Sequence, residues 1–252
     1  MERLTTDALV LRCRDHGEAD RLVHLITPRH GRIRAVARSA RRPQSRLTGS
    51  LMPATRSVFT LVSGRELYTV TGARGQERFD RLHASLLPMA VATYLMEIAD
   101  QSLGERDPAP EVYGLLLGLL TLLDAQRDPE ALLRAGEVRM LALMGFALDL
   151  HRCVRCRGEA QAGAGFAPAR GVLCARCRGA LAPLGADALA ALRSAADLPL
   201  PELGREPIPA QARRELGTVL GPALDQRLGR TPRSRAYLQQ LLGPGAQDAG
   251  EP

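Results

Sequence analysis

The 252-residue sequence contains no lysine, so all 34 of its Lys and Arg positions are arginines. Without lysine there is no P-loop lysine, no lysyl nucleophile of the nucleotidyl-transfer kind and no Schiff base. Several large classes of enzyme are therefore excluded. The five histidines form no HExxH motif and no other close pair on a helix face. We see no catalytic residues and predict that the protein is not an enzyme.

Aromatic residues are equally scarce, at 3% of the chain, and tryptophan is absent. Single-strand binders usually combine a basic groove with aromatic platforms on which bases stack, each worth about 1 to 3 kcal/mol. The barrel expected below contains only Phe59 and Tyr68. Stacking cannot be a main source of affinity for any nucleic acid that this chain binds.

Long apolar runs are missing as well. No stretch approaches the roughly 18 to 20 apolar residues that cross a bilayer, and the polar, arginine-bearing N-terminus does not resemble a secretory signal. We expect a cytoplasmic protein with no membrane partner.

The formal charge of +7 is unevenly distributed. Residues 1–81 hold 16 Arg against 8 Asp and Glu, whereas residues 82–252 hold 18 Arg against 19 acids. A GC-rich genome would explain the choice of Arg over Lys but not this segregation. The distribution indicates one polyanion-binding domain joined to a near-neutral body.

The first part of the chain has a β pattern. Short runs rich in Val, Ile, Leu and Thr predict strands at residues 8–14, 22–27, 32–38, 55–62 and 67–73. Turns are expected at 15–18 and 28–31. Five strands are too few for a sandwich, and closure into a small barrel removes the exposed edges. We expect an OB-like barrel, with Cys13 as a buried core thiol on the same period as Leu9 and Leu11.

The third strand carries the basic character of this domain. On a two-residue period, Ile33, Ala35 and Ala37 face the core and the alternate positions face outward. A solvated face is the ordinary interpretation of such arginines, but their density without interleaved acids favours a nucleic-acid surface. The predicted DNA-binding residues are Arg32, Arg34, Arg38, Arg41, Arg42, Arg46 and Arg56.

After Phe79 the pattern becomes helical. Helices are predicted at 86–103, 111–123, 129–144, 187–196, 211–228 and 232–242. Pro88 should lie in the first turn of its helix, or else that helix begins later than its pattern suggests. Asp128 and Thr231 should be N-caps, each followed by proline. Pro222 should break or kink the fifth of these helices.

Two CxxC pairs, Cys153 with Cys156 and Cys174 with Cys177, are separated by 17 residues. This spacing is typical of a four-cysteine zinc site, since two such turns complete a tetrahedron of thiolates. Disulfides are disfavoured in the cytoplasm, and iron–sulfur clusters usually need other spacings. We predict one structural Zn²⁺, because four sulfur ligands leave no open position for chemistry.

Five arginines surround the thiolates and have two interpretations of equal weight: a second nucleic-acid contact, or compensation of the negative charge of a zinc–thiolate centre. They are Arg152, Arg155, Arg157, Arg176 and Arg178.

Several segments together resemble a known family. The segments TDALVLRCRDHGEADR (6–21), TPRHGRIRAVARSARRP (27–43) and GRELYTVT (64–71) look like the N-terminal barrel of the bacterial RecO family of DNA repair proteins. The resemblance continues through the helix at 86–103, the CxxC pairs and Arg233-Ser234-Arg235. Two departures are Ser39, where the family often has Gly, and Arg157, which precedes the Gly that often follows the second cysteine directly.

The resemblance implies an α+β chain with an OB-fold, a helical body and an inserted zinc finger. The expected divisions are residues 1–80 (OB-fold), 81–150 and 182–242 (helical domain), 151–181 (zinc finger) and 243–252 (disordered tail). It also implies a recombination mediator that binds single- and double-stranded DNA, anneals complementary strands and, with RecR, assists RecA in gap and double-strand-break repair. Single-strand-binding protein is a further implied partner.

The residues themselves favour contacts from arginine to phosphate, which leave bases free to pair. Two other classes stay open. An RNA-binding or transcription-associated zinc-ribbon protein could use the same barrel and arginines, and a zinc hydrolase would require one cysteine to be a non-ligand.

Overall fold

The computed structural model describes residues 3–146, 148–168 and 170–243. The chain forms two compact units, Met1–Asp124 and Ala125–Pro252. The tail predicted at 243–252 lies, except for Gly243, outside the described residues.

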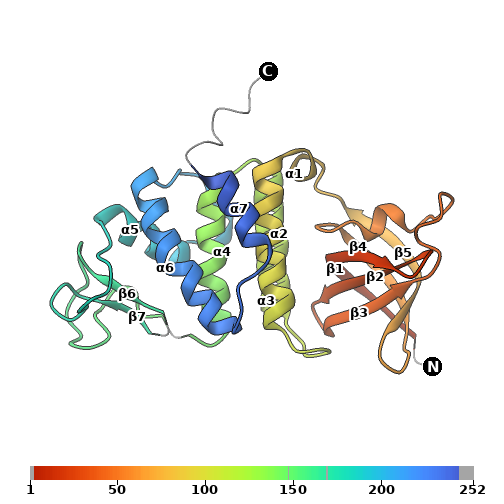
Figure 1. Ribbon diagram of the computed structural model, residues 1–252, viewed down its shortest axis with the longest axis horizontal. Coiled ribbons are helices and arrows are strands. Elements are labelled where there is room, and N and C mark those ends of the chain that lie inside the picture. The colour runs from red at the N-terminus through yellow and green to blue at the C-terminus, as the bar shows by residue number, and fades with distance from the viewer. Residues whose placement is uncertain (1–2, 147, 169, 244–252) are drawn as a thin grey trace, which may run out of the picture. The chain divides into compact units, whose positions relative to one another are not determined.

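The first unit begins with a closed five-stranded barrel (Figure 1, red to orange). Its strands are β1 (Arg3–His16), β2 (Asp20–Thr27), β3 (Gly31–Ala37), β4 (Arg56–Val62) and β5 (Tyr68–Glu77). Their order round the barrel is β1-β2-β3-β5-β4; β3 and β5 are parallel and the other pairs are antiparallel. The predicted OB-like barrel and α+β class are confirmed.

Alternation along the strands builds the barrel core. On β3, Ile33, Ala35 and Ala37 are buried inside, as predicted, and Arg32 and Arg34 face outward. The short 3-10 helix η1 (Thr48–Leu51) adds Leu51 to the core. The buried core residues are Ala8, Val10, Val23, Leu25, Ile33, Ala35, Ala37, Ala40, Leu51, Phe59, Leu61 and Val70.

The long strand β1 carries a bulge between Val10 and Arg12 where it pairs with β2. A bulge adds a residue to one strand and so shifts the alternation of its side chains. Cys13 consequently packs, half-buried, against the barrel core, as predicted for a core thiol, but not on the side of Leu9 and Leu11. The assumed common period of these three residues is wrong.

Three helices complete the first unit: α1 (Asp80–Ala84), α2 (Leu86–Ser102) and α3 (Pro110–Asp124). Pro88 lies in the first turn of α2, as predicted, where no intrahelical N–H bond is lost. Helix α2 contacts β1, and α3 contacts β2. The apolar outer residues of these strands, including Leu9, Leu22 and Ile26, are therefore buried although they lie outside the barrel core.

The second unit contains helices and a small hairpin. Its elements are α4 (Pro129–Leu143), β6 (Gly165–Ala167), β7 (Gly171–Leu173), α5 (Ala186–Asp197), η2 (Leu200–Glu202), α6 (Ala210–Leu228) and α7 (Ser234–Leu242). Helix α4 packs against α5 and α6. The predicted N-cap of α4 is confirmed, since Asp128 Oδ1 accepts a hydrogen bond of 2.7 Å from the Ala131 N–H.

Two helix predictions are corrected. Of the predicted break or kink at Pro222, the break is wrong: α6 continues through it, and Leu216, Leu220 and Leu224 are buried on both sides, so that packing can offset the roughly 3 kcal/mol that an interior proline costs. Helix α7 begins at Ser234, not at Pro232. Thr231 does not cap it, since its hydroxyl donates a hydrogen bond of 2.9 Å to Asp225 Oδ2 instead.

Candidate nucleic-acid interface and metal centre

The seven predicted DNA-binding arginines fall into two groups. Arg32, Arg34 and Arg56 lie on strands and form ion pairs with carboxylates. Arg38, Arg41, Arg42 and Arg46 lie in the loop after β3 and are exposed. The sequence alone does not separate these groups.

On β3, Arg32 and Arg34 face outward as predicted but reach carboxylates of the first unit's helices and loops. Arg32 Nη1 donates a hydrogen bond of 2.7 Å to the Asp100 carbonyl and lies 3.5 Å from Asp100 Oδ1. Arg34 Nε lies 2.5 Å from Glu105 Oε1. His24 Nδ1 is 2.9 Å from both carboxylate oxygens of Asp100. Although burial opposes ionisation of Asp100, His24 and then Arg32 hold the pKa of its carboxyl below the usual value.

Arg56 links β4 to β1 and, through Asp7, to α3. Its Nη2 donates a hydrogen bond of 2.8 Å to Asp7 Oδ2, and the same oxygen accepts a 2.8 Å bond from the Tyr113 hydroxyl. The bond to Asp7 raises the pKa of Arg56. This guanidinium is thus part of a contact between the barrel and α3.

The loop that follows β3, residues 38–46 (the arginine loop), is anchored beside the β1–β2 turn. The Arg41 N–H donates to the Ala19 carbonyl at 2.9 Å, and the Ser39 N–H donates to Asp20 Oδ1 at 2.8 Å. Ser39 has a φ of 52°, in the left-handed region that glycine favours. The fixed backbone holds the loop's side chains at one end of the barrel.

Of the four arginine side chains in the arginine loop, that of Arg41 alone has partners among the described residues. Its side chain lies 3.4 Å from Asp15 Oδ2 and donates to the carbonyls of Gly17 and Glu18. No described carboxylate pairs with Arg38, Arg42 or Arg46, and all three side chains are exposed. These three guanidiniums are available to external anions.

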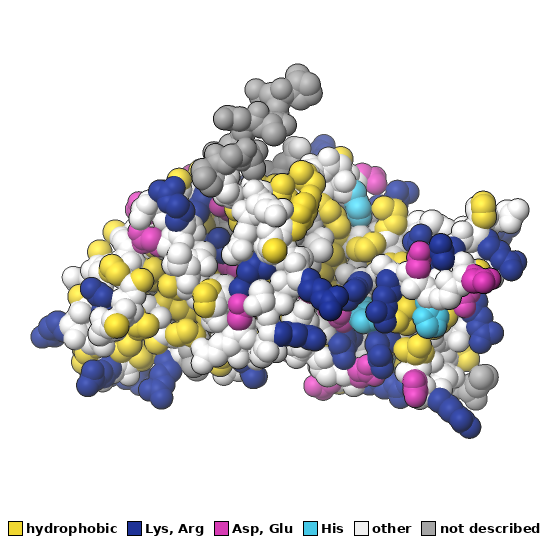
Figure 2. Space-filling view, viewed as in Figure 1, with side chains coloured by type: hydrophobic (Ala, Val, Ile, Leu, Met, Phe, Trp, Pro, Cys, Tyr) yellow, Lys and Arg dark blue, Asp and Glu magenta, His cyan; other side chains and the backbone are white. Residues whose placement is uncertain are grey.

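Two further exposed arginines of the barrel are not among the seven predicted DNA-binding residues. Arg12 and Arg14 are exposed on β1, opposite His24 and Leu22 of β2, and no described carboxylate pairs with either. The alternation of Arg12, Cys13 and Arg14 could have predicted that both arginines face outward from the strand. Figure 2 shows the mixed character of the barrel surface, where some arginine side chains lie beside carboxylates and others project alone.

The predicted metal ligands come together in the second unit. The Sγ atoms of Cys153, Cys156, Cys174 and Cys177 all lie within 4.8 Å of one another. Those of Cys156 and Cys174 are 3.7 Å apart. With Zn–S bonds near 2.3 Å, the sulfurs of a tetrahedral site would be separated by about 3.8 Å. The cluster therefore has the size of a four-thiolate metal site.

Backbone contacts connect the two cysteine turns. Strand β7 leads directly into Cys174, and the Val154 N–H donates a 3.0 Å hydrogen bond to the Val172 carbonyl. Each turn also closes on itself: the Arg157 N–H donates to the Cys153 carbonyl at 2.8 Å, and the Arg178 N–H to the Cys174 carbonyl at 2.9 Å. The protein thus positions the thiols from two separate turns.

Backbone N–H groups favour thiolates at this cluster. Burial opposes ionisation of Cys153, but hydrogen bonds from backbone N–H groups, that of Cys156 first, lower its pKa to about 6. Burial and the neighbouring sulfurs raise the pKa of Cys177 to about 12. Mutual repulsion of this kind is relieved when a cation binds thiolates.

The five arginines near the thiols also fall into two groups, those with a partner in the structure and those whose side chains are exposed without a described carboxylate partner. Arg157 Nη1 is 3.2 Å from Asp149 Oδ2, and the Arg178 side chain donates to the carbonyls of Gly179 and Leu181. The side chains of Arg152, Arg155 and Arg176 are exposed and have no partner among the described carboxylates. Both interpretations of these residues, anion contact and charge compensation, stay open.

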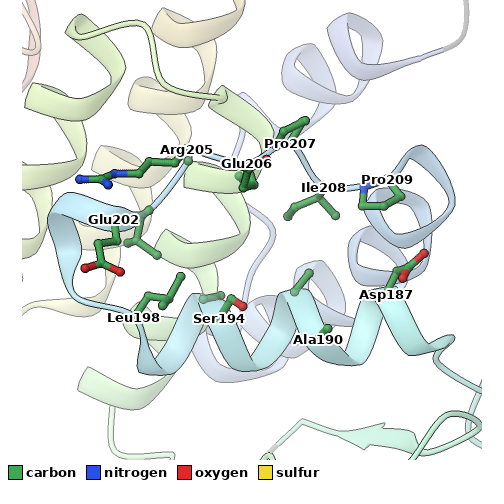
Figure 3. A pocket seen from close by; sticks show the side chains of 15 residues that line it. Asp187, Ala190, Ser194, Leu198, Glu202, Arg205, Glu206, Pro207, Ile208 and Pro209 are labelled. Atoms are coloured by element: carbon green, nitrogen blue, oxygen red, sulfur yellow. The ribbon is translucent and has the colours of Figure 1, made fainter.

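A pocket of about 430 Å³ lies in the second unit between α5 and residues 198–209. Figure 3 shows Ala190 and Ser194 of α5 facing Ile208 across it. Its lining includes the acids Asp187, Glu202 and Glu206 but a single arginine, Arg205. This mainly acidic lining would repel phosphate, so the pocket is not part of the candidate interface.

Among the described helices, none has the length and apolar character that a membrane span requires.

Comparison with known proteins connects both units to one family. The family model "Recombination protein O N terminal" matches residues 1–79, and "Recombination protein O C terminal" matches residues 83–236. A protein of Desulforudis audaxviator named DNA repair protein RecO is 37% identical over 245 residues, which cover 96% of this chain and 98% of that protein. Proteins with the same name from Pelotomaculum thermopropionicum and Symbiobacterium thermophilum are 35% and 40% identical, over 98% and 70% of this chain and 100% and 72% of their own lengths. The chain belongs to the recombination protein O (RecO) family.

Proposed function

We propose that this protein is a non-enzymatic recombination mediator that binds DNA phosphates through the arginine loop. The observation that carries this proposal is the exposure of Arg38, Arg42 and Arg46 without a described carboxylate partner. The name of the relatives, DNA repair protein, supports a role in repair. We expect the protein to act in the cytoplasm, on the nucleoid.

At the barrel, phosphate contact is favoured over base stacking by the placement of its two aromatic residues. Phe59 is fully buried in the barrel. Tyr68 is half-buried, and the Arg106 guanidinium lies over its ring, 5.1 Å from the centroid. Bound strands would therefore be held by their backbones and keep their base edges free.

Binding of this kind suits strand annealing. Neutralising the phosphates of two strands removes their repulsion, and the unoccupied bases can then pair. The same surface would bind single- and double-stranded DNA, because both present phosphates. Transfer of the product to RecA, with RecR and single-strand-binding protein as partners, is the mediator role that we propose from family membership.

We also propose that the four cysteines hold one structural zinc ion. The donor set fits zinc because four thiolates from two turns can enclose a tetrahedral ion. A closed set of sulfur ligands leaves no position for a substrate. The ion would stabilise a segment whose only described sheet is the hairpin of β6 and β7.

The experiment exchanges the three free arginines of the loop for glutamine. With the three free loop arginines on phosphate, the log–log salt slope for a single-stranded oligonucleotide should be roughly −2, from about 0.7 per contact. The variant Arg38→Gln, Arg42→Gln, Arg46→Gln should remove most of that slope and slow annealing of complementary strands. Fluorescence anisotropy at several salt concentrations measures the slope.

The matched control removes three exposed arginines of the second unit, Arg205, Arg214 and Arg230, which lowers the net charge equally. It should keep the slope of the unsubstituted protein. Equal losses in both variants would contradict a specific role for the arginine loop. Competition with RNA of equal length tests the alternative, since a marked preference for RNA would favour the RNA-binding class.

A further inference from the structure

The outward face of β3 is closed at one end by residues 103–109, which connect α2 to α3 (the α2–α3 connection; yellow-green in Figure 1). The Arg106 N–H donates a 3.0 Å hydrogen bond to the Arg32 carbonyl. The approach is close, since a Cβ on Gly31, whose φ is 55°, would lie 1.7 Å from the Asp107 carbonyl oxygen. These backbone contacts place Glu105 beside Arg32 and Arg34 of β3.

One carboxylate oxygen serves two guanidiniums there. Glu105 Oε1 lies 2.5 Å from Arg34 Nε and 3.7 Å from Arg32 Nη2. The short contact with Arg34 is not aligned as a hydrogen bond, and the Nε atoms of both arginines are buried without an acceptor among the described residues. Each guanidinium offers five N–H donors. Glu105 therefore pairs with Arg34 and shares Arg32 with Asp100, and the other N–H donors of the partly exposed Arg34 guanidinium are left for an anion with more oxygens.

The place of this cluster in the barrel indicates which anion. OB barrels bind oligonucleotides across the face of strands 2 and 3 and the loops between strands 1 and 2 and strands 4 and 5. The arginine loop is anchored beside the first of these loops, the β1–β2 turn. In this chain, one end of β3 leads into the arginine loop and the other carries Arg32 and Arg34. Arg34 and Arg38 are four residues apart, about 13 Å along an extended strand. One nucleic-acid strand held by the loop could reach both.

The Glu105 side chain is held weakly enough to be displaced. The side chains of Arg34 and Glu105 are 38% and 39% exposed, so their ion pair is screened by water. Arg106 has a φ of 60°, which is strained for a residue with a Cβ. Among the described residues, displacement of the Glu105 side chain breaks its ion pairs with Arg32 and Arg34 and no others.

We propose that Arg32 and Arg34 form a second phosphate-binding subsite, which the Glu105 carboxylate occupies until a nucleic-acid phosphate displaces it. The proposal rests on the DNA-binding function proposed for the arginine loop. Glu105 would lower the affinity of this subsite, because a phosphate must compete with a carboxylate already in place.

Glu105→Gln tests the proposal. It removes the competing charge, and a single-stranded oligonucleotide should bind about two- to fivefold more tightly, the factor that corresponds to a half-exposed ion pair. Glu111→Gln is the matched control, since Glu111 is an exposed acid in the first turn of α3 without an ion-pair partner among the described residues. Its effect on affinity should be smaller.

Arg34→Gln completes the comparison. Combined with Glu105→Gln, it should abolish the gain in affinity, because the gain depends on a freed guanidinium. Glu105→Asp keeps the charge and shortens the side chain, and should give an intermediate gain; it replaces Glu105→Gln if that variant is not folded by thermal unfolding.

Three results distinguish the proposals. A gain no larger than that of Glu111→Gln, or one that persists without Arg34, would overturn the subsite while the loop function stands. Failure of the unsubstituted protein to bind the oligonucleotide would instead refute the loop function. A gain confined to proteins that contain Arg34 supports both.

Discussion

The hydroxyl of Tyr113 on α3 donates a 2.8 Å hydrogen bond to Asp7 Oδ2 on β1. A helix is thus bound to the outside of the barrel through a carboxylate that also pairs with Arg56. The contact lies within the first unit and helps to explain why α3 belongs to it.

Replacing Tyr113 with phenylalanine should therefore destabilise the first unit by about 2 kcal/mol, the usual worth of a hydrogen bond to a charged group. Burial and then the bond to Asp7 raise the pKa of Tyr113 well above its ordinary value near 10. The contribution of a group with a raised pKa is complete below pH 10 and falls as the pH rises further. Urea unfolding of both proteins should show a difference that narrows above pH 10, and a constant difference would contradict this account.

Removal of one metal ligand should be far more harmful than removal of the fifth cysteine. Cys174→Ser should abolish stoichiometric zinc binding and lower stability by about 4 kcal/mol or more, because loss of a structural metal removes folding free energy. Cys13→Ser is the control, since Cys13 lies in the barrel core region and outside the cluster. Zinc content and thermal unfolding measure both effects. Full stability of Cys174→Ser would refute a structural ion.

The two cysteine turns share the sequence Cys-x-Arg-Cys-Arg-Gly, at 153–158 and 174–179, but not the same conformation. Gly179 has a φ of 57°, whereas in the first turn the left-handed residue is Arg157, not Gly158. Gly179→Ala should cost about 1 to 2 kcal/mol, the penalty for a Cβ in this region. Gly158→Ala should cost less, since its Cβ would meet only Cys156 Sγ, at 3.6 Å. Thermal unfolding of the two variants tests the order, and equal losses would contradict it.

Helix α4 contains a buried ion pair, in which Arg134 Nη1 lies 2.6 Å from Glu137 Oε2. Glu137→Gln should destabilise the protein by about 3 to 5 kcal/mol, because it leaves a buried guanidinium without its counter-charge. The double variant Arg134→Met, Glu137→Leu should recover most of this loss. Denaturant unfolding of the single and double variants provides the comparison, and a double variant as unstable as the single one would show that the pair contributes more than charge compensation.

Much of the fold follows from local pattern. The two-residue period of β3 predicts which of its side chains are buried, and the CxxC spacing predicts the four-cysteine cluster. Local pattern fails where tertiary contacts compete with it. The Thr231 hydroxyl donates a hydrogen bond to Asp225 instead of capping α7. The bulge in β1 places Cys13 and Leu9 on opposite faces of the strand.

The amino-acid sequence by itself determined the barrel, the six longer helices, the cysteine cluster and the concentration of arginine in the first 81 residues, because periodicity, spacing and charge are properties of neighbouring positions. Only the tertiary structure decided which arginines are free. Arg32 meets Asp100, 68 residues away, and Arg34 meets Glu105, whereas Arg38, Arg42 and Arg46 have no described partner. An ion pair depends on which carboxylate the folded chain brings near, and a linear pattern contains no information about that distance.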